Sequence, residues 1–155
     1  MKRIIMLVAM CFIMISISGC GGDLNAAYDD DTAIAKGGDS SRSSGASSMR
    51  IGNDLSVKAT MTGAKTIWEY STSKEVDVSL SFLLSVSEGG RAKLVLITPY
   101  DEVIILAENT DNTIVKEKQS KTVTLNPGKN RIKLVCSDAP KFELKLNVEV
   151  GELEW

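Results

Sequence analysis

The strongest constraint on the fold of this chain is an alternation of apolar and polar residues that runs from Val76 to Val86. The even positions carry Val76, Val78, Leu80, Phe82, Leu84 and Val86, and the odd positions between them are mostly Ser and Asp. A helix turns once every 3.6 residues and would spread these apolar side chains around its whole surface, whereas a strand places them on one face. The segment is therefore predicted to be a β-strand with one buried face.

The same two-residue period recurs through most of residues 51–155. It predicts further strands over residues 55–62, 65–70, 123–125, 132–136 and 142–148. Turn residues separate them, notably Gly63 and the run Asn126-Pro127-Gly128, which suits a type II turn. About eight strands with turn signals between them and no convincing helix predict an all-β protein, an antiparallel β-sandwich.

The end of the chain adds a resemblance to this pattern. From Leu125 to Val148 the sequence has a Leu-x-x-Gly-x-x-x-Ile-x-Leu run followed by an alternating final strand. This arrangement resembles the closing strands of jelly-roll, galactose-binding-like and carbohydrate-binding β-sandwich modules. The resemblance implies a jelly-roll-like strand order. An immunoglobulin-like order is the alternative, although no Cys-Trp-Cys framework supports it.

One predicted hairpin breaks the alternation, because residues 94–97 and 103–106 are apolar at every position. With the turn centred on Tyr100-Asp101, Ile97 would lie opposite Ile104 and Val95 opposite Leu106, all on the outer face of a two-layer sandwich. We hypothesise that Val95, Ile97, Ile104 and Leu106 form an exposed apolar patch that contacts a partner protein. In the alternative interpretation the chain covers this stripe itself, either with Ile114 and Val115 or with residues 24–35.

The first 20 residues carry an export signal. Lys2 and Arg3 precede an uncharged apolar run over residues 4–17, which is too short for a permanent membrane span. The run ends in Ile17-Ser18-Gly19-Cys20, which resembles the bacterial lipobox. The resemblance implies a signal peptide over residues 1–19, lipidation of Cys20, and a location on the outer side of a bacterial cell membrane, held there by the lipid.

Composition divides the rest of the chain into two parts. Residues 20–50 are rich in Gly, Ser, Asp and Ala and are predicted to be a disordered tether, with Asp29-Asp30-Asp31 as a solvated charge run rather than a calcium site. Residues 51–155 are predicted to be the single β-sandwich domain.

Charge and cysteine content exclude several functions. The chain has 18 basic and 20 acidic residues, and removal of the signal peptide takes away two of the basic ones, so no basic surface for nucleic acid is expected. Of the three cysteines, Cys11 would be removed with the signal peptide and Cys20 would carry the lipid. Cys136 would then stand alone, at a position whose parity predicts a buried, inert thiol.

Catalysis is not expected. The chain contains no histidine, which removes the usual general base and the commonest metal ligand. Asp101 and Glu102 are adjacent carboxylates of a turn and are expected to be solvated there, and we predict no metal and no cofactor. The predicted function is a membrane-anchored, non-catalytic binding or accessory module that interacts with an envelope protein. The alternative is a glycan-binding module that uses Trp68, Tyr70 and Tyr100, although core burial is the favoured role for Trp68.

Overall fold

The computed structural model of the protein describes residues 23–155, so the predicted signal peptide and Cys20 lie outside the described residues. The described chain contains two short helices followed by nine strands. They are η1 (Ala26–Asp29), α1 (Asp31–Ala35), β1 (Ser40–Ile51), β2 (Asp54–Thr72), β3 (Val76–Glu88), β4 (Arg91–Ile97), β5 (Val103–Thr110), β6 (Gln119–Leu125), β7 (Gly128–Ser137), β8 (Lys141–Val148) and β9 (Glu152–Leu153).

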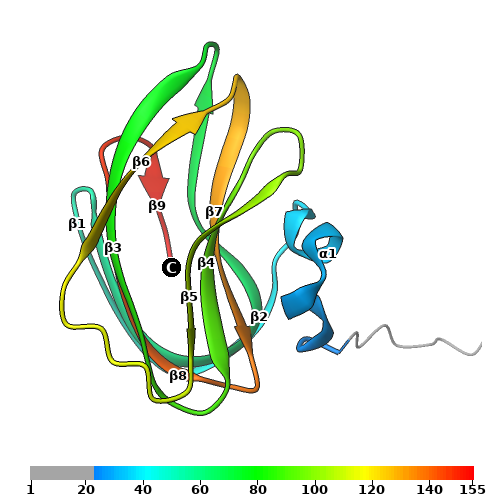
Figure 1. Ribbon diagram of the computed structural model, residues 1–155, viewed down its shortest axis with the longest axis vertical. Coiled ribbons are helices and arrows are strands. Elements are labelled where there is room, and N and C mark those ends of the chain that lie inside the picture. The colour runs from blue at the N-terminus through cyan, green and yellow to red at the C-terminus, as the bar shows by residue number, and fades with distance from the viewer. Residues whose placement is uncertain (1–22) are drawn as a thin grey trace, which may run out of the picture.

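The strands form two facing antiparallel layers that share the long strand β2 (Figure 1). The first half of β2 pairs with β1 and β8, and β8 continues to β3 and β6. The second half of β2 pairs with β9 and β7, and β7 continues to β4 and β5. The interleaved orders β2-β8-β3-β6 and β2-β7-β4-β5 are those of a jelly roll, which confirms the predicted antiparallel β-sandwich.

Gly63 lies where β2 passes from one layer to the other. It pairs with Ser41 of β1 on one side and with Cys136 of β7 on the other, and its φ of 97° is one that residues with a side chain rarely adopt. The sequence pattern predicted that a strand ends at Gly63 and a second begins at Lys65. The structure instead has one strand that bends there, because glycine allows the change of layer without a break in pairing.

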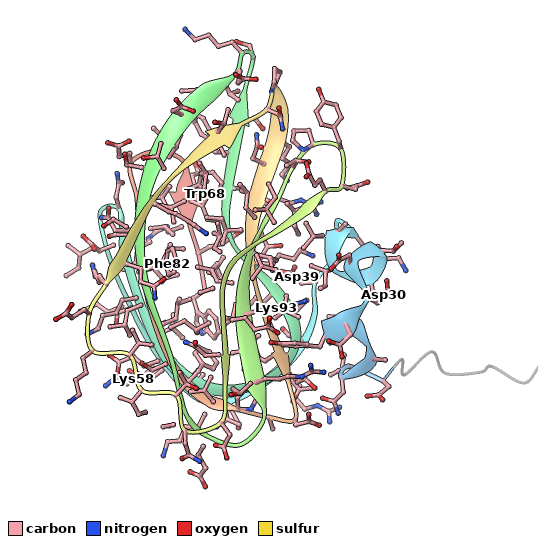
Figure 2. All side chains as sticks on the ribbon, in the orientation of Figure 1. Asp30, Asp39, Lys58, Trp68, Phe82 and Lys93 are labelled. Carbon is pink, nitrogen blue, oxygen red and sulfur yellow. The ribbon has the colours of Figure 1, made fainter. Side chains whose placement is uncertain are left out.

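The main core fills the space between the two layers. Trp68 of β2 and Phe82 of β3 point into it from opposite sides, as Figure 2 shows. The indole nitrogen Nε1 of Trp68 donates a hydrogen bond of 2.6 Å to the carbonyl oxygen of Val150, so its one polar group is satisfied while the ring is buried. The alternating residues of β3 also point inward, as their period predicts.

Residues 23–50 differ from the predicted tether. They contain η1, α1 and most of β1, and only β1 is exposed along its whole length. The predicted charge run has local roles, since the carboxylate of Asp30 caps α1 by accepting a hydrogen bond from the Ala33 amide at 3.1 Å. The average composition of this segment hides two large side chains, Tyr28 and Ile34, and both are completely buried against the sandwich. Burial of side chains of this size contributes about 1.5–3 kcal/mol each.

The single cysteine of the described residues, Cys136, lies in the main core. Burial raises the pKa of its thiol far above the ordinary value, so the reactive thiolate is suppressed. Over residues 23–155 there is also no helix that is both long and apolar enough to cross a membrane.

Candidate functional site

The predicted apolar patch is not a surface. Val95 and Ile97 have no exposed area, because Tyr28, Ile34 and Ala35 of the N-terminal segment pack against them in a second, smaller apolar cluster. This cluster lies on the outer face of the layer that contains β4 and β7, where Figure 1 shows η1 and α1. The hypothesis of an exposed protein-binding patch is therefore wrong, and the alternative in which the chain covers the stripe with residues 24–35 accounts for Val95 and Ile97.

The other two residues of the predicted patch lie on the opposite face. Val95 pairs with Ile105, Ile97 pairs with Val103, and the register shifts by one residue between Leu94 and Val95. A shift of one residue turns a strand's side chains to the other face. Leu106 consequently packs in the main core, while Ile104 stays at the sheet edge with 37% of its area exposed. The hairpin turn is centred on Tyr100 itself, which shifts the predicted pairing by one residue beside the turn, and the bulge between Leu94 and Val95 restores the predicted pairing farther along the hairpin.

The three aromatic residues predicted to contact a glycan have very different environments. Trp68 is buried in the core and cannot stack against a ligand. Tyr70 is half-buried, with its ring 6.2 Å from that of Trp68 at 30°. Tyr100 has 73% of its area exposed at the tip of the β4–β5 turn. The predicted core burial of Trp68 is therefore confirmed. Only Tyr70 and Tyr100 remain candidates for contact with a ligand.

Tyr70 and Tyr100 lie at the same end of the sandwich, which we call the turn end. It is formed by residues 69–71 of β2, the β4–β5 turn over residues 98–102, the β6–β7 turn over residues 126–129, and residues 151–152. The side chain of Thr98 accepts hydrogen bonds from the amides of Tyr100 and Glu102, each at 3.3 Å, and so fixes the turn that presents Tyr100. A Cβ atom on Gly128 would come within 2.8 Å of the Pro99 ring, so glycine is what allows the two turns to touch.

Two polar hollows lie side by side at the turn end, and Lys129 lines both. The first has a volume of about 350 Å³ and is lined by Gly37, Thr98, Pro99, Asp101, Lys129 and Arg131. The second has a volume of about 420 Å³ and is lined by Glu69, Tyr70, Ser71, Lys129, Gly151 and Glu152. In the sequence, Tyr100 stands between two residues that line the first hollow, and Tyr70 is one of the residues that line the second.

Ion pairs hold the charged groups of these hollows in place. The Lys129 ammonium lies 2.7 Å from the Glu69 carboxylate, and the Arg131 guanidinium lies 3.6 Å from the Asp101 carboxylate. Both acids and Lys129 remain largely open to solvent, so they keep donor and acceptor positions free for a ligand. The sequence analysis did not single out Lys129 or Arg131. Their positions on β7 alternate with core residues, and only the pairing of β7 with β2 brings them beside Glu69 and Tyr70.

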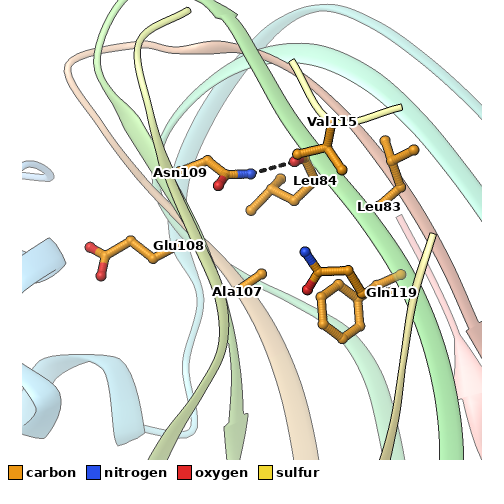
Figure 3. A pocket seen from close by; sticks show the side chains of 8 residues that line it. Leu83, Leu84, Ala107, Glu108, Asn109, Val115 and Gln119 are labelled. Atoms are coloured by element: carbon orange, nitrogen blue, oxygen red, sulfur yellow. Dashed lines mark hydrogen bonds between the residues drawn. The ribbon is translucent and has the colours of Figure 1, made fainter. Parts of the chain in front are cut away.

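Two other hollows are less suited to a polar ligand. One hollow of about 170 Å³ opens between β3 and β5 at the side of the sandwich (Figure 3). The side-chain amide of Asn109 lies across it and donates a hydrogen bond to the carbonyl oxygen of Leu84. Another of about 390 Å³ lies on the outer face of β2, β3 and β8, next to the exposed Ile114, and contains no exposed aromatic side chain. Among residues 23–155 no three His, Cys, Asp or Glu side chains are grouped closely enough to hold a metal ion.

Comparisons with known proteins place similar structures among carbohydrate-binding modules. No protein-family model matches the chain, and no curated protein sequence matches it either. A carbohydrate-binding module of Cellvibrio mixtus lichenase 5A, solved in complex with cellotriose, is 11% identical over 73% of this chain and 91% of its own, with a TM-score of 0.38. A family 4 module is 10% identical over 79% and 83%, with a TM-score of 0.39, and a family 29 module is 11% identical over 72% and 76%, with a TM-score of 0.37. At these scores the assignment of the fold rests on the strand order of the chain itself.

Proposed function

We propose that this protein is a lipid-anchored, non-catalytic glycan-binding module of a bacterial cell envelope, with its binding site at the turn end. The observation that carries the proposal is the exposed Tyr100 ring, which stands on the same turn as Thr98, Pro99 and Asp101, at an end of the sandwich with two hollows lined by charged and hydroxyl groups. The lipid anchor is proposed from the sequence Ile17-Ser18-Gly19-Cys20.

The chemistry of the turn end suits a sugar. A pyranose has an apolar C–H face, which packs on an aromatic ring, and a rim of hydroxyl groups that both donate and accept hydrogen bonds. Tyr100 offers the ring, and Lys129, Asp101 and Glu152 offer charged partners for hydroxyl groups. Two hollows of this volume, joined at Lys129, would take neighbouring units of an oligosaccharide.

A protein-interacting module is the less favoured function. That hypothesis rested on the stripe of the β4–β5 hairpin, and the N-terminal segment covers the outward-facing part of it. The large apolar side chains that remain exposed include Ile51 on β1, Ile105 on β5 and Ile114 in the loop between β5 and β6. Scattered residues of this kind are normal on a soluble surface and do not define an interface.

We also propose that the module lacks catalytic activity. Hydrolysis of a glycosidic bond needs two carboxyl groups that flank the bond, one of them an acid with a raised pKa. At the turn end, Asp101 pairs with Arg131 and Glu69 pairs with Lys129. Each of these two acids is therefore engaged by a cation of β7, an arrangement that suits a binding site.

The proposal is tested by substitution of the exposed tyrosine. Tyr100→Ala should weaken binding of a cell-wall or extracellular oligosaccharide about tenfold, which corresponds to the loss of roughly 1.4 kcal/mol of stacking. Tyr100→Phe keeps the ring and should retain most of the affinity. Isothermal titration with an oligosaccharide selected on a glycan array measures both. Equal binding by wild type and Tyr100→Ala would remove the turn end from the proposal, and the absence of any glycan ligand would overturn it.

A further inference from the structure

The N-terminal residues 23–39, which we call the strap, are bound firmly along the outer face of β4 and β7 (Figure 1). We propose that the strap holds the domain directly beside its lipid anchor, with the turn end facing away from the membrane. This inference rests on one part of the proposed function, the lipid on Cys20. The domain would then be attached through a short segment that fixes its orientation relative to the membrane, and not through a long flexible tether.

Two cationic side chains of β7 hold the C-terminal half of the strap. The Arg131 guanidinium donates hydrogen bonds to the carbonyl oxygens of Ala35 at 2.7 Å and Lys36 at 3.1 Å. The Lys133 ammonium donates to the carbonyl oxygens of Lys36 at 2.8 Å and Gly38 at 3.1 Å. Lys133 has no exposed area, so most partners of its charge belong to the strap. Removal of the strap would leave this ammonium without those partners, which is strongly unfavourable.

Asp39 closes this end of the strap. Its carboxylate accepts hydrogen bonds from the amide and the hydroxyl of Thr66, at 2.9 and 2.7 Å, and lies 3.4 Å from the Lys133 ammonium. Burial lowers the pKa of Lys133, and Asp39 offsets part of this effect. Figure 2 shows Asp39 between the strap and the sandwich.

Tyr28 holds the N-terminal half of the strap. Its ring is completely buried, with the Arg91 guanidinium 4.2 Å and the Lys93 ammonium 4.7 Å from the ring centroid. The Tyr28 hydroxyl donates a hydrogen bond of 2.9 Å to Glu108, and Arg91 also pairs with Asp29 at 2.5 Å. Both halves of the strap therefore meet the sandwich, through apolar, cation–π and ionic contacts.

The strap begins at the end of the sandwich opposite the proposed glycan site. The side chain of Asn25 accepts a hydrogen bond of 2.9 Å from the amide of Asp138, just beyond the last residue of β7. Lys129 of the turn end is at the other end of that strand. From Lys129 to Ser137 the strand advances eight residues, or about 26 Å at 3.3 Å per residue. The start of the strap and the glycan site are thus separated by about the length of the domain's strands.

The chain between the lipid and the strap is very short. Two residues, Gly21 and Gly22, connect Cys20 to Asp23, and the three residue steps of a fully extended chain span at most about 11 Å. A flexible tether of thirty residues would reach about 30 Å by the square-root rule and would let the domain turn freely. With the strap bound, the end near Asp138 must stay close to the headgroups, and the turn end must project outward.

The test uses the full chain, lipidated in a bacterial host, purified in detergent and reconstituted into phosphatidylglycerol/phosphatidylcholine vesicles with an acceptor dye on the headgroups. Glu88→Cys, which is exposed near Asp138, and Tyr100→Cys each provide one accessible labelling site, because Cys136 is buried. Energy transfer to the headgroups should be clearly more efficient from position 88 than from position 100.

Each outcome of this test has a definite meaning. If the protein is bound to the vesicles and energy transfer is equally efficient from positions 88 and 100, the proposed orientation of the domain is overturned. Failure to float would overturn it through its premise, the lipid on Cys20. Neither result depends on a glycan, so loss of the glycan proposal in a separate titration would leave the anchored geometry intact.

A strap variant separates the strap from the lipid. Tyr28→Ser with Ile34→Ser removes its two buried anchors without altering a residue of the sandwich. It should reduce the difference in transfer between the two labels and increase hydrogen exchange at the amides of α1. The matched control, Met49→Ser with Ile51→Ser, changes two exposed apolar residues of β1 and should leave both measurements unchanged. If the strap variant shows the same difference in energy transfer between positions 88 and 100 as the unsubstituted strap, the proposed role of the strap is contradicted. If this variant does not fold, the comparison of the two labels with the unsubstituted strap still tests the orientation.

Discussion

Replacing Trp68 with alanine should lower the free energy of unfolding by about 3–5 kcal/mol, a large part of the stability of a domain of this size. Trp68 is the largest completely buried side chain, and alanine would leave a cavity between the layers. The carbonyl oxygen of Val150 would also lose the indole N–H that it accepts at 2.6 Å. Chemical denaturation followed by circular dichroism measures the change.

Two variants check this explanation. Trp68→Phe keeps an aromatic ring but removes the N–H and part of the indole volume, so it should cost less than Trp68→Ala and remain folded if the alanine variant does not. Tyr100→Ala removes an exposed ring and should change stability by no more than about 0.5 kcal/mol. A Trp68→Ala variant as stable as Tyr100→Ala would contradict the burial of Trp68 and return it to the set of possible ligand contacts.

Replacing Gly63 with alanine should destabilise the protein by at least about 3 kcal/mol, because two penalties act at one position. A residue with a side chain is strained at a φ of 97°. In addition, the new Cβ atom would overlap the carbonyl oxygen of Ser40 and lie 3.0 Å from the Cα atom of Ser41, and both of these are backbone atoms. The variant should lose pairing between β1 and β2, which thermal unfolding and amide hydrogen exchange would detect.

Gly52→Ala is the matched control for this substitution. Gly52 also has a positive φ, 56°, but no atom lies within 4 Å of the position that a Cβ would occupy. It should therefore show the backbone strain alone, about 1 kcal/mol. If Gly63→Ala and Gly52→Ala lower the stability equally, the close contact with β1 does not explain the glycine at the bend of β2.

The fold could be predicted from the sequence because the strands are amphipathic. Val78, Leu80 and Phe82 face the core as their two-residue period requires, and the turn at Pro127-Gly128 lies where it was expected. The strap was predicted only as an alternative, in which residues 24–35 cover the apolar stripe, since its composition is that of a flexible linker. Its order comes from Tyr28 and Ile34, whose burial depends on a face built by β4 and β7 far along the chain.

The site was only partly predictable for a related reason. Exposure of Tyr100 follows from its position in a turn, which the sequence indicates. Nothing in the local sequence brings Lys129 beside Tyr70, because that neighbourhood is created by the pairing of β7 with β2. The error at the apolar hairpin was similar, since a one-residue difference in the pairing beside the turn placed Leu106 on the core face.

The central claim, a glycan site at the turn end, is tested most directly by mapping amide chemical shifts of ¹⁵N-labelled protein during titration with an oligosaccharide selected on a glycan array. The structure predicts changes concentrated at residues 69–71, 98–102, 128–131 and 151–152, with little effect on the outer face of β3 and β8. Shifts confined to that outer face, or no shifts with any glycan tested, would contradict it.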